Sequence, residues 1–315
     1  MRPRPRFATS QNAVIEFLRN FFLGARLSSD ISTRIPRAAR KASAAQALAV
    51  QETIHKIAAL PEISEVARTR LMPKGFYALA GELTRVFDAY LEGLRTAMNL
   101  TQAARPGTPE GFQACTTAPM TITAIEALNI LRRIRAWPDF PTLGQELLRL
   151  AQLQMQDVQA QLKPKQDPNR PGLKTAQAGR LAFAQRGEPC PFLDPEKKKC
   201  RIWEQRPYSC RMQHIVGSVD RVDPRHPEHK LVQIKNLRLP MAQQMSLVNH
   251  VDRRLGLELS PILYAALLQI LEKGQPQGLG LPEVGEVPPR LAADGTYVPA
   301  ANRNVKHAKK FNKDK

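Results

Sequence analysis

The chain has 315 residues, a length that can bury a substantial core in one large domain or in two smaller ones. Its 47 Lys and Arg outnumber 28 Asp and Glu, and the formal net charge of +19 favours anionic partners. No apolar run approaches the roughly 20 residues of a membrane-spanning helix, and charges interrupt residues 14–23, where a secretory signal would need an apolar core. We therefore expect a cytoplasmic protein, with an Arg-rich organelle transit peptide as the alternative, because no acidic residue precedes Glu16.

Apolar residues recur at three- and four-residue spacing through the first hundred residues, which is the period of an α-helix. One such stripe covers residues 14–22 and another covers residues 79–94. Between them, the alanine-rich stretch 38–59 favours a helix by intrinsic propensity. Stripes of this kind are typical of a helical core, so we predict an N-terminal helical region over residues 1–107 and assign no chemistry to it.

Two further helices are expected after the Pro- and Gly-rich break at residues 105–109. Thr123 and Glu126 have the spacing of a capping box, in which each side chain satisfies an orphan backbone N–H of the other residue. Thr142 and Gln145 repeat this spacing, and they predict a second helix that continues to about residue 162.

The C-terminal third contains two more predicted helices and a basic tail. Helical periodicity covers residues 237–255 and stops at Gly256, and a last helix is expected between the N-cap Ser260 and Gly274. From residue 275 onward Pro, Gly and Lys dominate the sequence, which predicts an unstructured tail.

The chain contains four cysteines, Cys115, Cys190, Cys200 and Cys210, and the last three are evenly spaced. Those three fall in a stretch that is rich in proline and charge, has no helical period and is too polar to pack by itself. Four thiolates complete a tetrahedral zinc site, or hold an iron or iron–sulfur centre, and such coordination stabilises folding directly. From spacing alone, free buried thiols and two disulfides in a secreted protein stay open as alternatives.

Neighbouring side chains are expected to support the ion. A divalent ion with four thiolates carries a net charge of about −2, which the basic residues beside the cysteines would offset. Arg206 and Arg211 are expected to donate to sulfur or to pair with a nearby carboxylate, namely that of Glu204 or Asp194. Trp203 would keep the site dry, and Pro207 would fix the turn that aims Cys210.

Histidines supply the alternative ligands. His214 lies four residues after Cys210 and is the candidate to replace one thiolate in a site of three cysteines and one histidine. His226 and His229 are further candidates, although a loop histidine is more often a surface residue.

The segment CPFLDPEKKKCRIWEQRPYSCR, residues 190–211, resembles the signature of the zinc- or iron-chelating CxxCxxCC family, also called YkgJ-type cysteine-cluster proteins. That signature combines a CPFL element, a Cys-x-Ile-Tyr/Trp-Glu element and an Arg-Pro-x-x-Cys-Arg element, and all three are present here. Upstream, Cys115 precedes an Ile-Thr-x-x-Glu-Ala sequence, as the family's cysteine cluster does. The other three cysteine positions of that cluster are occupied by Thr108, Gly111 and Ala114.

The resemblance implies chelation of zinc or iron by Cys115, Cys190, Cys200 and Cys210, with no reaction established for most members of the family. The missing upstream cysteines argue against a multi-iron cluster and leave enough ligands for one mononuclear site. We therefore expect a mostly α protein, in which a helical bundle-like region packs on a loop-rich, cysteine-stapled metal-binding module over residues 108–274. The expected role is that of an interaction or accessory protein with a structural ion.

Two other classes of function stay open. Some relatives with similar cysteine signatures are described as iron–sulfur oxidoreductases or flagellin lysine methylases, but this chain has no recognisable glycine-rich S-adenosylmethionine loop. The sequence also shows no complete catalytic constellation, so it does not decide whether the protein is an enzyme. Alternatively, the basic termini form a nucleic-acid-binding module, in which the tail over residues 275–315 contacts phosphates.

Overall fold

The computed structural model describes a large part of the chain, and within that part the protein is mostly helical, as the sequence predicts. The described residues are 32–100, 104–116, 122–164, 173–216, 218–222, 226–228, 233–238, 242–257, 259, 263–273, 281–286, 290–291 and 297–298. None of the helices in these ranges combines the length and the apolar character that crossing a membrane requires. The stripe predicted at residues 14–22 lies outside them.

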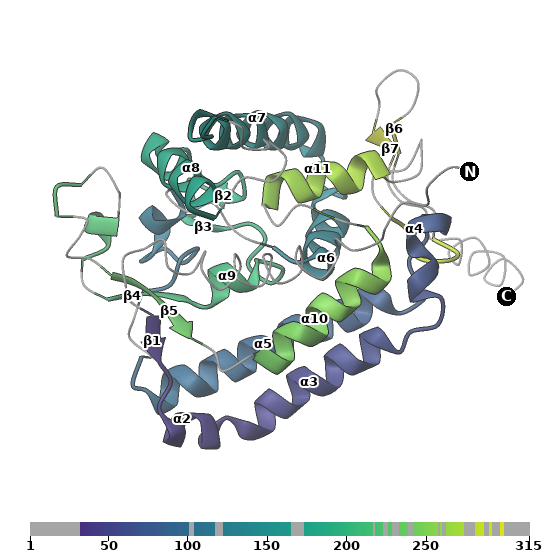
Figure 1. The fold of residues 1–315 in the computed structure, drawn as a ribbon, viewed down its shortest axis with the longest axis horizontal. Helices are drawn as coiled ribbons and strands as arrows, with labels where there is room; N and C mark the ends of the chain where they lie inside the picture. Colours follow the sequence, from purple (N-terminus) through teal and green to yellow (C-terminus); the bar gives the residue numbers. More distant parts are fainter. Residues whose placement is uncertain are drawn as a thin grey trace, which may run out of the picture.

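Three long helices lie along one side of the molecule (Figure 1), with α3 packed against the other two. They are α3 (Ala44–Ala58), α5 (Phe76–Ala97) and α10 (Ala242–Leu255). The buried residues of α5 recur every three or four positions, which confirms the stripe at residues 79–94. The alanine-rich stretch forms α3 together with the short α2 (Arg37–Ala42), so that helix is confirmed as well, with a break at Ser43.

The helix α6 (Ala124–Ile134) contacts α5, α10 and α11, and most of its residues are buried. Its predicted capping box is confirmed, because the Thr123 N–H donates to Glu126 Oε2 at 2.9 Å and the Glu126 N–H donates to Thr123 Oγ1 at 3.4 Å. On the side opposite α3 lie α7 (Phe140–Ala160), α8 (Leu173–Arg186) and α11 (Leu263–Lys273) (Figure 1).

A three-stranded sheet accompanies the helices, and the sequence did not predict it. Its order is β1-β5-β4, with β1 (Ser32–Arg34) parallel to β5 (Gln233–Arg238) and β4 (Gln213–Val216) antiparallel to β5. The remaining elements are short. They are η1 (Ile63–Glu65), α4 (Val66–Thr69), η2 (Phe112–Thr116), β2 (Leu193–Asp194), β3 (Lys199–Cys200), α9 (Tyr208–Arg211), η3 (Val219–Val222), β6 (Arg290–Leu291) and β7 (Tyr297–Val298).

Two predicted boundaries differ from the structure, and a third is tested only at its end. The helix predicted from residue 237 begins at Ala242, because Leu237 belongs to β5, although it does end at Gly256 with a positive φ of 62°. The second capping box is wrong, since α7 begins at Phe140 and Thr142 lies inside its first turn. The last helix ends at Lys273, directly before Gly274 as predicted, while its predicted start at Ser260 lies outside the described residues.

The tail predicted to be unstructured from residue 275 is ordered at residues 281–286. There the Met72 N–H donates to the Pro282 carbonyl at 2.7 Å, and Glu286 pairs with Arg132 at 2.7 Å and with Arg135 at 2.9 Å. Because Arg135 is buried, its charge requires compensation, and its ion pair with Glu286 holds residues 281–286 against α6. The division into three regions, residues 1–107, 108–274 and 275–315, stays a prediction.

The buried core is continuous from α3 and α5 through α6 to α7 and α11. Phe192, Ile202 and Tyr208 belong to this same core, and Cys190, Cys200 and Cys210 pack against it. The stretch around the cysteines was expected to be too polar to pack by itself; the structure instead gives it buried apolar anchors. The expected cysteine-stapled module is therefore not seen as a separate unit.

Candidate metal centre

The four cysteines come from three segments that main-chain hydrogen bonds hold together. Cys190 precedes β2, Cys200 ends β3 opposite Leu193, Cys210 lies in α9, and Cys115 lies in η2 of the loop over residues 104–116. The Cys190 N–H donates to the Cys115 carbonyl at 3.0 Å, which joins the upstream cysteine to the downstream motif. The structure thus brings the predicted upstream and downstream halves together.

Gly107 allows the upstream loop to approach the β2–β3 hairpin closely. Its carbonyl accepts the Cys200 N–H at 3.0 Å, and its φ of +84° favours glycine. A Cβ at this position would lie 2.9 Å from the Cys200 Cβ and 3.2 Å from the Trp203 ring. From the sequence, this glycine was predicted only to lie in a break between helices, although the Pro106-Gly107 pair is the signal of a special turn.

All four cysteines are free and partly buried. Burial is the largest cause of the raised pKa of each thiol, and the pKa of Cys115 rises to about 12. Neighbouring sulfurs add to this effect: Cys200 and Cys115 both raise the pKa of Cys190 and that of Cys210. The four sulfurs are therefore close enough to influence one another, and as free thiols they are neutral near pH 7.

Backbone N–H groups act in the opposite direction on three of the sulfurs. Hydrogen bonds from the Phe192 and Ile202 N–H groups lower the pKa of Cys190 and Cys200, and in each case the donor follows its cysteine by two positions. A hydrogen bond from Gly107 does the same for Cys115. Donors aimed at sulfur stabilise the thiolate, which is the form that binds a metal ion.

Within the part of the chain that the structure describes, no three His, Cys, Asp or Glu side chains converge closely enough to form a metal-ligand group. Zinc holds thiolates at about 2.3 Å, so binding an ion here would require the cysteine side chains to move together. His214, the candidate substitute ligand, lies in β4 with its side chain fully buried. His226 Nδ1 accepts the Glu228 N–H at 3.0 Å, and His229 lies outside the described residues.

Arg206 places a buried positive charge beside the sulfurs. Its guanidinium lies 3.3 Å from the centroid of the Trp203 ring, and among the described residues its Nε and Nη1 have no hydrogen-bond partner. Its charge lowers the pKa of Cys115, Cys200 and Cys210. Since a buried cation is costly unless it is paired, this arginine fits a site in which the neighbouring sulfurs become negative. The donor set therefore fits a thiolate-bound metal ion.

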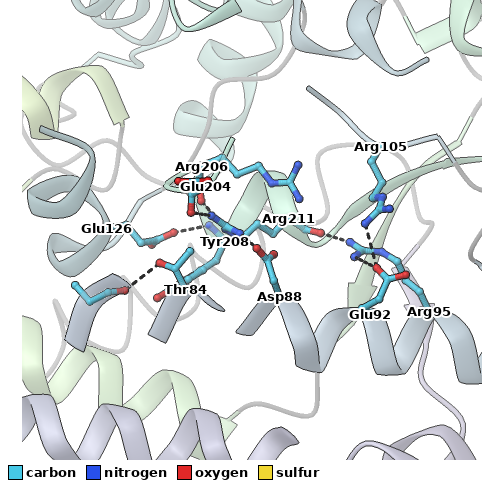
Figure 2. Close-up of polar contacts among 11 residues, drawn as sticks. Thr84, Asp88, Glu92, Arg95, Arg105, Glu126, Glu204, Arg206, Tyr208 and Arg211 are labelled. Carbon is cyan, nitrogen blue, oxygen red and sulfur yellow. Dashed lines mark hydrogen bonds and ion pairs between the residues drawn. The ribbon is translucent and has the colours of Figure 1, made fainter. Parts of the chain in front are cut away.

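Arg211 supports the backbone around Cys210 instead of donating to sulfur. Figure 2 shows its guanidinium among Asp88, Glu204 and Arg206. It forms an ion pair with the Asp88 carboxylate, its Nε donates to the Arg206 carbonyl at 2.7 Å, and its Nη2 donates to the Glu204 carbonyl. The sequence had pointed to sulfur or to the carboxylates of Glu204 and Asp194, and only the main chain of Glu204 takes part.

The turn before Cys210 is fixed from two sides. Pro207 precedes α9 and its carbonyl accepts the Arg211 N–H at 3.0 Å, in line with the turn-forming role predicted for it. The Tyr208 N–H donates to the carboxylate of Glu126, the same group that closes the capping box of α6. The capping box was predicted, but this second contact of Glu126 was not, because it joins residues far apart in the sequence.

Comparison with known families agrees with this assignment. The model of the CxxCxxCC family, described as "Putative zinc- or iron-chelating domain", matches residues 145–234. Residues 145–234 are thus similar to the CxxCxxCC domain. The matched segment contains Cys190, Cys200 and Cys210 and begins downstream of Cys115, so the fourth cysteine comes from outside the matched residues. No curated protein and no solved structure is significantly similar to the chain.

Proposed function

We propose that this protein binds one zinc or iron ion through Cys115, Cys190, Cys200 and Cys210, and that the ion has a structural role. The observation that carries the proposal is the buried guanidinium of Arg206: its Nε and Nη1 have no hydrogen-bond partner among the described residues, and its charge lowers the pKa of Cys115, Cys200 and Cys210. The family description supports the choice of zinc or iron without separating the two metals.

The residues around the sulfurs would each have a definite task. A bound ion would convert the four thiols to thiolates and leave a net charge of about −2 for a divalent metal. The Arg206 guanidinium balances part of that charge, and Trp203 covers one face of the guanidinium. The Gly107, Phe192 and Ile202 N–H groups stabilise the sulfur charge and orient the thiolates.

Four protein thiolates fill a tetrahedral site and leave no open position for a substrate, which supports a structural ion over a catalytic one. The ion would then cross-link the loop over residues 104–116, the β2–β3 hairpin and α9. In this proposal the protein is an accessory or interaction protein, and its net charge of +19 favours an anionic partner.

Elemental analysis of protein purified without oxygen tests the proposal. We expect one metal ion per chain in the wild type and a loss of that ion in the Cys200→Ser and Cys210→Ser variants. Met155→Ser is a matched control, because it removes an exposed sulfur on α7. A colourless protein containing zinc and a protein with a visible thiolate–iron band would identify the metal. Unchanged metal content in both cysteine variants would contradict the proposal.

A further inference from the structure

A charged face of α5 contacts the loop that carries Cys115 and the turn that carries Cys210. Asp88, Glu92 and Arg95 are spaced by four and three residues, so they project from one side of the helix. All three precede the CxxCxxCC match at residues 145–234. Figure 2 shows this face turned toward Arg211 on one side and toward Arg105 on the other.

The first contact fixes the turn that carries Cys210. Arg211 follows Cys210 directly, and α5 holds it twice: Asp88 pairs with its guanidinium, and Arg95 Nη2 donates to its main-chain carbonyl. The two remaining guanidinium contacts of Arg211 bind the carbonyls of Glu204 and Arg206. Through Arg211, α5 thus holds the main chain at Glu204 and Arg206, which leads into the turn that carries Cys210.

The second contact reaches the loop that carries Cys115. The Glu92 carboxylate accepts a hydrogen bond from Arg105 Nη1 at 3.1 Å and lies 3.6 Å from Arg95 Nη1. The Arg105 carbonyl in turn accepts the Thr108 hydroxyl at 2.8 Å, within the turn that contains Gly107. The loop and the Cys210 turn are therefore tied to the same side of one helix.

The two contacts differ in strength. The Arg211 side chain is completely buried, with 0% exposure, and Asp88, which is itself 41% exposed, compensates that buried charge. The pair between Glu92 and Arg105 is more accessible to water, with side chains 48% and 32% exposed, and accessible pairs of this kind contribute little. Asp88 is therefore the dominant member of the face.

We propose that Asp88 is a positioning residue for the metal site, which acts through Arg211 to align Cys210 and Arg206 with the other ligands. This inference rests on the proposed metal binding and gives the N-terminal helical region a part in it. Glu92 and Arg95 have the same role with smaller effects.

The Kd for Co²⁺ and Zn²⁺, measured by competition titration, tests the role of Asp88. Asp88→Asn should raise the Kd by about 10- to 100-fold, the range typical of residues that orient metal ligands. Glu92→Gln should raise it by less than about threefold. Glu82→Gln is the matched control on the same helix, because Glu82 pairs only with the exposed Lys56 in the contacts described, at 3.4 Å, and it should leave the Kd unchanged.

A second measurement needs no metal. In metal-free Asp88→Asn protein, iodoacetamide should alkylate Cys210 faster than in the wild type. Cys190 in the same molecule serves as the reference, because none of the polar contacts described joins α5 to its segment. Asp88→Glu keeps the charge and should restore much of the protection of Cys210. If circular dichroism shows that the Asp88→Asn protein is unfolded, Asp88→Glu replaces it in both measurements. The expected changes in Kd and in alkylation rate are then smaller than those given for Asp88→Asn.

The outcomes separate the inference from the proposed function. A wild type that binds no metal ion would contradict the proposed function, and the alkylation of Cys210 would still decide whether Asp88 positions that cysteine. A wild type that binds metal, together with Asp88 variants of unchanged Kd and unchanged Cys210 alkylation, would overturn the inference alone.

Discussion

Replacing Arg206 by methionine should change the metal-free and the metal-loaded protein in opposite directions. In the metal-free protein this guanidinium is buried, with 5% exposure, and burial lowers its pKa from 12.5 to about 10. Keeping the charge at neutral pH therefore costs on the order of 3 kcal/mol relative to the unfolded chain. Stacking on Trp203 offsets about 1–2 kcal/mol of that cost. We expect Arg206→Met to raise the free energy of unfolding of metal-free protein by about 1–2 kcal/mol.

With the ion bound, the same substitution removes the cation that lies beside the thiolates. We expect the affinity for zinc to fall by about 10- to 100-fold, which corresponds to about 1.4–2.8 kcal/mol. Urea unfolding in the presence of a chelator measures the first effect, and a competition titration with zinc measures the second. The stabilised apo protein would thus be the weaker metal binder.

Arg201→Met is the matched control for this experiment. Its guanidinium also stacks on a tryptophan, 3.9 Å from the centroid of the Trp137 ring, but it is exposed at the surface and pairs with Asp139 at 2.7 Å. Its replacement should change both quantities by less than about 0.5 kcal/mol. A metal-free Arg206→Met protein that is less stable than the wild type and binds zinc equally well would refute the reasoning.

Three further results are expected. Burial raises the pKa of Glu126 and Asp252 to about 7, above their usual values of 4.5 and 3.8, so both carboxyls contribute stability that is present below about pH 4 and lost as the pH rises through 7. Glu126→Gln should remove on the order of 3 kcal/mol of this pH dependence, measured by urea unfolding of metal-free protein. An unchanged pH dependence would contradict this expectation. Gly107→Ala should lower both stability and zinc affinity, whereas Gly75→Ala has a similar positive φ but meets no described atom within 4 Å, so it should affect stability alone. If the basic tail binds nucleic acid, deleting residues 303–315 should flatten the slope of log affinity against log salt concentration by nearly one unit for each phosphate that the tail neutralises. An identical slope for the truncated protein would exclude phosphate binding by the tail.

The helices were predictable because their information is local. The stripe at residues 79–94 and the Thr123–Glu126 capping box each specify structure within one or two turns, and both are found where expected. The β5 strand was missed because its partners β1 and β4 lie far away in the sequence or in a stretch without periodicity. An apolar residue such as Leu237 fits either a helix or a strand until those partners are known.

The candidate site divides in the same way. The cysteines and Arg206 could be found from composition and from the family signature, since residue type alone suggests thiolate chemistry and its counter-charge. Asp88 could not, because an aspartate on an amphipathic helix is normally a solvated residue, and only the fold brings it to Arg211. The nucleic-acid hypothesis for the basic termini stays a prediction, since residues 1–31 and 299–315 lie outside the described ranges.

The buried anchors around the cysteines change what metal removal is expected to do. If the ion were the sole source of cohesion, chelation would release the whole segment from residue 190 to residue 211. Phe192, Ile202 and Tyr208 lie in the main core, however, and burying each contributes about 1.5–3 kcal/mol independently of any ion. Chelation should therefore leave the circular dichroism spectrum nearly unchanged while trypsin cleavage after Lys197–Lys199 accelerates, because those lysines are exposed and their turn has no such anchor. A loss of helical signal on chelation would show that the ion, rather than these side chains, holds the segment in place.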